Sequence, residues 1–292
     1  MKKTGVSKGI RRREPVLDCL TALVMTLCVI CSVTPFLYVF AMSFSSGAAI
    51  TNSHVFLWPV GFNTEAYHTV LAYPHFFRAY GYTLLFAFGG TLISLVMTSL
   101  LAYPLSKTWL RGRKTVMRMV VFSMFFSGGM IPNYLLVSGL HLTGTVWAIL
   151  IPFAVNQFYL IILINFFSAL PSEIEEAATI DGLDYFGILL RIVLPLSKPA
   201  LTTIGLYTFV FFWNNWFYPL IYLKSSQYPV MLLLRNIVNG SASASEGTAR
   251  NAALSIAVKS AVILVSSLPV LLIYPFFQKS FVRGMTLGAV KG

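Results

Sequence analysis

Six apolar stretches most constrain what this chain of 292 residues can fold into. Each is about 24 residues long or more, whereas about 20 helical residues suffice to cross the hydrocarbon core of a bilayer. Backbone polar groups in that core must be satisfied within the protein, so each stretch predicts a helix. The sequence therefore predicts an all-α integral membrane protein with six transmembrane helices, over residues 16–43, 80–105, 117–140, 145–170, 200–223 and 252–277.

The third stretch contains residues that interrupt a helix. Gly128, Gly129 and Pro132 lie near its middle. A break of this kind is tolerated at membrane depth only where the freed backbone is buried in protein or faces a watery cavity. We therefore expect a broken third helix.

The basic residues orient the chain. Only 10% of residues are charged, against about 25% in soluble domains. The net charge of +12 does not indicate nucleic-acid binding, because the basic residues flank the apolar stretches, as the positive-inside rule requires. The predicted topology has both termini and the central loop in the cytoplasm. It puts sixteen of the 21 Lys and Arg residues there: Lys2, Lys3, Lys8, Arg11, Arg12, Arg13, Lys107, Arg111, Arg113, Lys114, Arg118, Arg191, Lys198, Lys279, Arg283 and Lys291.

The central loop, residues 171–199, holds five of the nine carboxylates. Ser172 followed by Glu175 predicts a capping box at the start of a short helix. Gly182 predicts a left-handed turn that ends this helix. Asp184 is placed to cap a second helix, which we expect to end before Pro195. A short acidic helix pair between membrane spans predicts a surface that docks with another protein.

The loop also resembles a known family. Its spacing of Glu176-Ala177-Ala178, Gly182, Ile192 and Leu194-Pro195 is similar to the cytoplasmic EAA loop in membrane subunits of ATP-binding-cassette importers. The resemblance implies a type I importer permease fold, with a basic N-terminus (1–15), a permease domain (16–278) and a cytoplasmic tail (279–292). It also implies ATPase-coupling residues: Glu176, Ala177, Ala178, Asp181, Gly182, Ile192, Leu194 and Pro195.

The same resemblance implies partners. They are a second, non-identical permease subunit, two ATPase subunits that hold ATP and Mg, and an extracytoplasmic solute-binding protein. The tail 281–292 resembles that of carbohydrate importers, which implies an oligosaccharide as cargo. The implied location is a bacterial plasma (inner) membrane, with lipid around the chain and no nucleic acid.

The sequence lacks motifs for catalysis. It has no GxxxxGK[ST] phosphate loop and no HExxH or GxSxG motif. Its four histidines (His54, His68, His75 and His141) lack the spacing of metal ligands. We therefore expect a transport subunit that is not an enzyme and has no catalytic residue, metal or cofactor of its own.

The fifth stretch holds the residues best suited to a sugar. Trp213 and Trp216 are predicted on one helical face, and the amides of Asn214 and Asn215 lie between them. Aromatic rings suit the C–H faces of a sugar, and amides suit its hydroxyls. Interfacial tryptophan and helix-packing asparagine are the alternative interpretations. The full set of candidate pathway residues is Trp213, Asn214, Asn215, Trp216, Tyr218, Asn133 and Tyr134.

Several alternatives stay open at this point. The chain is alternatively a permease for another solute class, a stand-alone secondary carrier or a membrane scaffold. Lys259 is either a residue that reaches the outer interface or a pathway residue. Residues 240–247 form either a loose outer connection or a surface for the binding protein.

Overall fold

The computed structural model describes residues 15–244 and 254–273. The predicted basic N-terminus, residues 245–247 of the small-residue stretch and the tail lie outside these residues, apart from Pro15. Every regular element in the described part of the chain is a helix. The chain forms two compact units, one from Met1–Tyr67 with Ala244–Leu264 and one from His68–Ser243 with Val265–Gly292.

The first unit is dominated by one long apolar helix. Most described side chains of α1 (Pro15–Ser43) are exposed, including many large apolar ones. A helix that is apolar on all sides belongs in lipid. Two short helices follow, α2 (Gly47–Thr51) in this unit and α3 (Glu65–Leu71), within which the first unit ends at Tyr67.

The second unit contains the remaining labelled helices. They are α4 (Phe76–Leu84), η1 (Leu85–Gly89), α5 (Gly90–Ser106), α6 (Arg113–Phe125), α7 (Met130–Gly139), α8 (Trp147–Leu150), α9 (Gln157–Ser168), α10 (Ser172–Ile180), α11 (Tyr185–Ile188), η2 (Leu189–Val193), α12 (Leu194–Leu196), α13 (Lys198–Asn214), α14 (Phe217–Tyr222), η3 (Ser225–Gln227) and α15 (Val230–Ala244).

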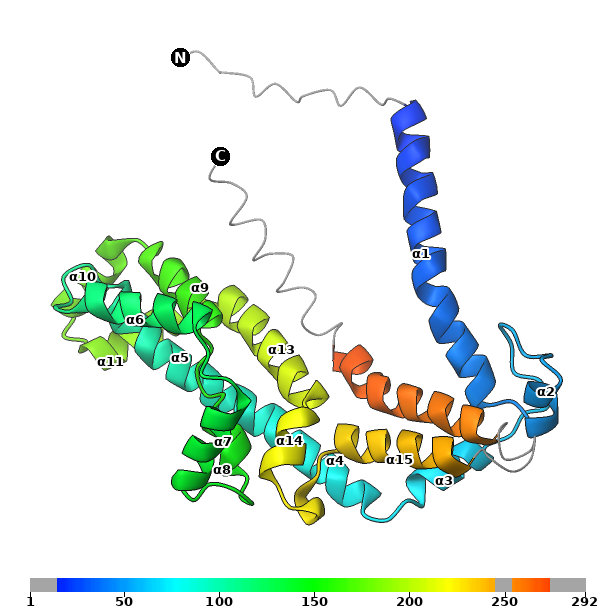
Figure 1. The fold of residues 1–292 in the computed structure, drawn as a ribbon. Helices are drawn as coiled ribbons and strands as arrows, with labels where there is room; N and C mark the ends of the chain where they lie inside the picture. The colour runs from blue at the N-terminus through cyan, green and yellow to red at the C-terminus, as the bar shows by residue number, and fades with distance from the viewer. Residues whose placement is uncertain (1–14, 245–253, 274–292) are drawn as a thin grey trace. The chain divides into compact units, whose positions relative to one another are not determined.

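The centre of this unit is a continuous helix of 31 residues, Phe76–Ser106, which joins α4, the π-helical turn η1 and α5. Helices α9 and α13 pack along α5 (Figure 1). One core cluster, around Leu163, Val193 and Ile204, joins the ends of these helices to the central loop. A second cluster lies around Phe86, Ile149 and Phe212.

Three helices are long and apolar enough to cross a membrane without a break: Leu17–Ser43, Phe76–Ser106 and Leu254–Ile273. They confirm the first, second and sixth predicted spans. Three further candidates are bent pairs, which brings the count of spans to as many as six. One pair, α6 and α7, bends by 120° at residues 126–129, so the predicted break of the third stretch is confirmed.

The fourth and fifth predicted spans are not continuous helices, which corrects the sequence-based expectation. In the fourth, the first helix ends at Leu150, just before Pro152, and helical structure starts again after Asn156. The Asn156 side-chain oxygen accepts hydrogen bonds from the backbone N–H groups of Phe158 and Tyr159. The fifth breaks after α13, where Asn215 is extended. Asparagine favours such breaks because its side chain competes for backbone hydrogen bonds.

Residues 240–244 of the small-residue stretch, for which the sequence left a loose outer connection and a surface for the binding protein both open, form the last turn of α15. Alanine has the highest helix propensity, and a helix that has started adds further residues at little cost.

Candidate functional site

The central loop folds as a helix, a glycine turn and a second helix, as predicted. Helix α10 is nine residues long and ends where Gly182 has a φ of 84°. A left-handed φ of this kind favours glycine. The Asp184 carboxylate then accepts a hydrogen bond of 2.8 Å from the backbone N–H of Gly187, which caps α11.

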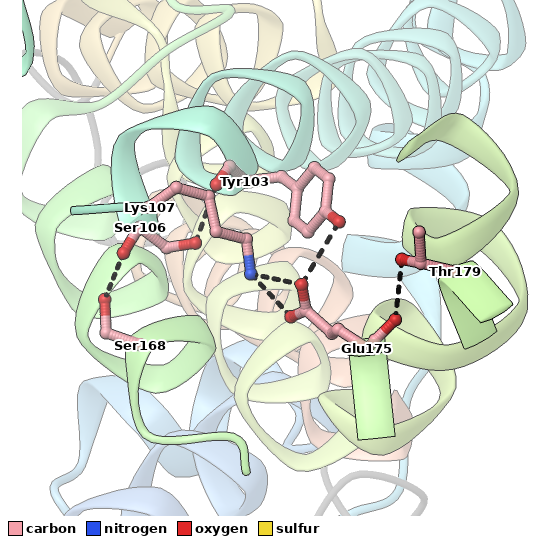
Figure 2. Close-up of polar contacts among 6 residues, drawn as sticks. All are labelled: Tyr103, Ser106, Lys107, Ser168, Glu175 and Thr179. Atoms are coloured by element: carbon pink, nitrogen blue, oxygen red, sulfur yellow. Dashed lines mark hydrogen bonds and ion pairs between the residues drawn. The ribbon is translucent and has the colours of Figure 1, made fainter. Parts of the chain in front are cut away.

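The predicted capping box is wrong. Pro171 occupies the N-cap position of α10 and makes no side-chain cap, and Ser172 is already the first helical residue. Since a capping side chain must precede the helix, the Ser172 hydroxyl cannot take that role. The Glu175 carboxylate points instead toward Lys107, at the end of α5 (Figure 2).

The second helix of the loop does not end before Pro195, as expected, but continues to Leu196. A π-helical turn over Leu189–Val193 precedes the proline, and Pro195 stands at the start of α12. At a helix start, proline needs no N–H partner. The changed hydrogen-bond pattern of the π turn therefore lets the helical run accommodate Pro195.

Packing gives the loop a buried face and an exposed face. Ala178, Ile188 and Val193 are buried in the core cluster shared with α5 and α9. Ile192 and Leu194 are half-buried. The exposed face carries Glu176, Ala177, Asp181, Gly182 and Pro195, together with Ile180, which is 86% exposed. An acidic face with an exposed isoleucine suits contact with a partner that has a basic and apolar surface.

A cavity of about 320 Å³ lies in the second unit, beside the break in the fourth stretch. The Thr208 hydroxyl, on a side chain that is 3% exposed, has no hydrogen-bond partner among the described residues. A buried hydroxyl without a partner is costly, so an incoming ligand would stabilise it. The cavity is lined by Ser94, Pro152, Phe153, Val155, Asn156, Gln157, Tyr159, Thr208 and Phe211.

The chemistry of this cavity suits a hydroxyl-rich ligand. The rings of Phe153, Tyr159 and Phe211 supply apolar faces. The Asn156 oxygen is taken by backbone N–H groups, which leaves its amide N–H₂ as a donor. Within residues 15–244 and 254–273, no charged side chain lines the cavity. Pockets of a few hundred Å³ with apolar walls and a few polar groups are typical of small-molecule sites.

The two tryptophans of the fifth stretch do not share a helical face, contrary to prediction. Because Asn215 leaves the helix, Trp213 belongs to α13, whereas Trp216 precedes α14. Trp213 is 1% exposed and its indole donates to the Ser266 carbonyl at 3.1 Å. The Trp216 ring is half-buried beneath the Arg235 guanidinium, at 3.6 Å from the ring centroid.

The remaining pathway candidates divide into amides and tyrosines. Asn214 and Asn133 are exposed, while Asn215 is buried and its amide nitrogen has no hydrogen-bond partner in the described part of the chain. Tyr218 lies 4.5 Å from Phe153 between ring centroids, and both Tyr218 and Tyr134 stack on Tyr222 at 6.1 Å. The tyrosines therefore form an aromatic row that reaches the cavity at Phe153.

Sequence reasoning missed the cavity and the partner of Glu175. Asn156 and Gln157 interrupt an apolar stretch four residues after Pro152, and this polar break was the available signal. Nothing in the sequence pointed to Thr208, because a single threonine in a membrane helix is common. For the described residues, no group of three or more His, Cys, Asp or Glu side chains could hold a metal ion.

Broken apolar helices, a cavity lined by polar and aromatic side chains and an acidic central loop are together typical of a membrane permease subunit. The family model for the binding-protein-dependent transport system inner membrane component matches residues 100–287. The chain belongs to this family, and the resemblance drawn from its central loop is confirmed.

Individual relatives cover most of the chain. The Bacillus subtilis proteins LplC and YtcP, the latter a polygalacturonan/rhamnogalacturonan transport system permease, are each 42% identical over 89% of this chain and over 90% and 93% of their own lengths. A chain from the crystal structure of a bacterial ABC transporter that imports the acidic polysaccharide alginate is 33% identical. It covers 96% of this chain and 100% of its own, with a TM-score of 0.83.

Proposed function

We propose that this chain is one permease subunit of an ATP-driven importer for a carbohydrate, and that the cargo is an oligosaccharide. The observation that carries the proposal is the conformation of the central loop, with its turn at Gly182 and its capped second helix. One face of the loop is buried in the apolar core, and the opposite face is exposed and acidic. The relatives named for polygalacturonan, rhamnogalacturonan and alginate transport support a carbohydrate as cargo. A further relative, AraQ of Bacillus subtilis, is named for arabinooligosaccharides and is 30% identical over 69% of this chain.

The proposed topology has six spans in a bacterial plasma (inner) membrane, with both ends of the chain and the central loop in the cytoplasm. The basic residues around the loop support this orientation, because Lys107, Arg111, Arg113 and Lys114 all lie beside it in the sequence-based topology. The third proposed span is the bent pair α6 and α7. The fourth and fifth would cross the membrane mainly as α9 and α13, each of which bends sharply against a helix of the central loop.

The proposed complex contains a second, non-identical permease, two ATPase subunits and an extracytoplasmic solute-binding protein. This chain has no phosphate-binding loop, so the ATPase subunits would hold ATP and Mg. When the two ATPases close, the coupling residues Glu176, Ala177, Ala178, Asp181, Gly182, Ile192, Leu194 and Pro195 would move with them. The spans would then turn the cargo cavity from one side of the membrane to the other.

Within this chain, cargo would contact the cavity and the aromatic row. Thr208, Asn156 and Gln157 would exchange hydrogen bonds with sugar hydroxyls, while Phe153 and Phe211 would cover ring faces. Tyr134, Tyr218 and Trp216, with the amides Asn133, Asn214 and Asn215, would form the approach. Trp213 would support the approach from within the core.

The test is the composition and activity of the complex purified from its native membrane in mild detergent. Intact mass is expected to find two ATPase copies and one distinct permease with this chain. The reconstituted complex, supplied with its binding protein, should take up labelled oligosaccharides derived from pectin, alginate or arabinan only when ATP is present. A chain that purifies alone and transports without ATP would be a secondary carrier. A complex that moves no cargo would support a scaffold.

A further inference from the structure

Two adjacent carboxylates on α10 have different surroundings. The Glu175 carboxylate lies against the Lys107 ammonium, at 2.5 Å from each oxygen, and accepts a hydrogen bond of 3.4 Å from the Tyr103 hydroxyl (Figure 2). Glu176, its neighbour, is exposed. One carboxylate therefore faces the chain's own core, and the next faces outward.

The Glu175 contact is shielded from water. The side chains of Lys107 and Glu175 are 17% and 18% exposed. Ion pairs at this level of burial are screened less than surface pairs, and loss of one partner leaves a costly unpaired charge. The Lys107 ammonium also lies 4.8 Å from the Tyr103 ring centroid. The pair is therefore a firm connection between α10 and the end of α5.

Further contacts hold the same end of α5. The Ser168 hydroxyl, at the end of α9, donates to the Ser106 carbonyl at 3.1 Å (Figure 2). In the turn that follows α5, the ring of Trp109 packs against that of Tyr185 on α11, with centroids 5.7 Å apart. The end of α5 is thus connected to both helices of the docking loop.

The other part of α5 reaches the cavity. Ser94 lines the cavity and lies twelve residues before Ser106. At the rise of an α-helix, twelve residues correspond to about 18 Å, or roughly half the thickness of a membrane. Because α5 is one unbroken helix between these points, a movement of its end is transmitted to the cavity wall.

We infer that Glu175 is a positioning residue, which fixes the docking helix to α5 through Lys107 so that the ATPase movement enters the membrane along α5. The inference rests on the proposed function. It assigns the two carboxylates different tasks. Glu176 would meet the ATPase, whereas Glu175 would pass the movement on within the chain.

The experiment compares Glu175→Gln with wild type in the reconstituted complex. Three quantities are measured: retained ATPase subunits by intact mass, ATP hydrolysis, and uptake of labelled oligogalacturonides. We expect full retention of the ATPase, continued hydrolysis and an approximately fivefold fall in uptake per ATP hydrolysed, within the range by which coupling residues act. Asp18→Asn, which removes an exposed carboxylate from α1, is the control and should match wild type.

The charge-exchanged double variant Lys107→Glu/Glu175→Lys tests the pair itself. It should recover most of the lost uptake per ATP, which a purely steric role of Glu175 would not allow. Glu176→Gln provides the contrast and is expected to weaken ATPase retention.

Three outcomes would overturn the inference. If Glu175→Gln keeps the wild-type uptake per ATP hydrolysed, the pair does not transmit the movement. If that variant loses ATPase subunits, Glu175 is a docking residue. If the charge-exchanged double variant does not recover uptake per ATP, the role of Glu175 does not depend on its charge interaction with Lys107. Absence of ATP-dependent uptake of every labelled oligosaccharide by wild type would instead contradict the proposed function.

Discussion

The ring of Phe212 on α13 lies directly against the bare backbone of Gly90 on α5. A β-carbon built on Gly90 would lie 2.5 Å from that ring, closer than real atoms approach. Phe212 is 1% exposed and belongs to the core cluster around Phe86 and Trp213, so its ring has little room to move. The close approach of α5 and α13 therefore depends on glycine at this position.

Gly90→Ala is expected to destabilise the chain, because the added methyl group forces Phe212 or the helices apart. Overpacking of this kind costs about 1–3 kcal/mol. The neighbouring variant Gly89→Ala is the matched control, since nothing lies within 4 Å of its added β-carbon. Thermal unfolding of the purified complex, followed by tryptophan fluorescence, should show a lower midpoint for Gly90→Ala alone. Equal midpoints for the two variants would contradict this contact.

Gly182→Asp is expected to uncouple transport. Its β-carbon would meet nothing within 4 Å, so the effect comes from the left-handed backbone at φ 84°, which costs a side-chain-bearing residue about 1–2 kcal/mol. The strain would shift the turn that joins α10 to α11 and with it the docking face. Uptake per ATP hydrolysed in proteoliposomes measures the effect.

Gly139→Ala is the control for the turn variant, because Gly139 lies in a helix and its β-carbon also meets open space. It should transport like wild type. If Gly182→Asp keeps normal cargo-stimulated hydrolysis and uptake, the docking assignment of the loop is wrong.

Thr208→Val is expected to weaken cargo binding without weakening the fold. The substitution keeps the shape of the side chain and removes a buried hydroxyl that has no partner within the described chain. The loss of one hydrogen bond to cargo corresponds to about 1 kcal/mol, a rise of about fivefold in the half-saturating oligosaccharide concentration. Concentration-dependent uptake provides the measurement.

Thr203→Val serves as the comparison on the same helix. Its hydroxyl already bonds the Pro199 carbonyl, one turn earlier, and it does not line the cavity. Half-saturation should stay at the wild-type value. If Thr208→Val leaves the half-saturating oligosaccharide concentration unchanged, the cavity is a packing defect and does not bind cargo through Thr208.

Trp213→Ala and Trp216→Ala are expected to fail in different ways. Trp213 is fully buried, and its removal leaves a large cavity that costs about 3–5 kcal/mol, so the complex should lose thermal stability and yield. Trp216 is half-buried and covered by Arg235, so its removal should leave the unfolding midpoint near wild type and lower uptake. Loss of uptake by Trp213→Ala at an unchanged midpoint would instead favour direct contact of its indole with cargo.

The docking loop was largely predictable because its structure is local. A left-handed glycine, an aspartate cap and a proline each act on residues within one turn, so Gly182 and Asp184 have the conformations that their chemistry indicates. The capping box failed because Pro171, and not Ser172, precedes the first turn of α10. Only the partner of Glu175 is non-local: Lys107, 68 residues away, is a stronger partner than a backbone N–H group.

The fourth and fifth spans show the limit of hydropathy. The helices in these two stretches are candidate spans only as parts of bent pairs, because hydropathy does not detect a break where polar groups have partners inside the protein. The side chains of Asn156 and Asn215 each accept backbone hydrogen bonds at such a break. Trp213 and Trp216 were assigned to one helical face for the same reason.

The sequence by itself determined the class of this protein. Apolar length requires membrane helices, the placement of Lys and Arg predicts their orientation, and the spacing of the central loop identifies the family. These properties depend on composition and short separations along the chain. Only the tertiary structure decided which side chains meet, namely Glu175 with Lys107, Phe212 with Gly90, and Thr208 with Ser94 and Asn156 around one cavity. Those contacts join distant helices, and their geometry is set by how α5, α9 and α13 pack rather than by any local preference.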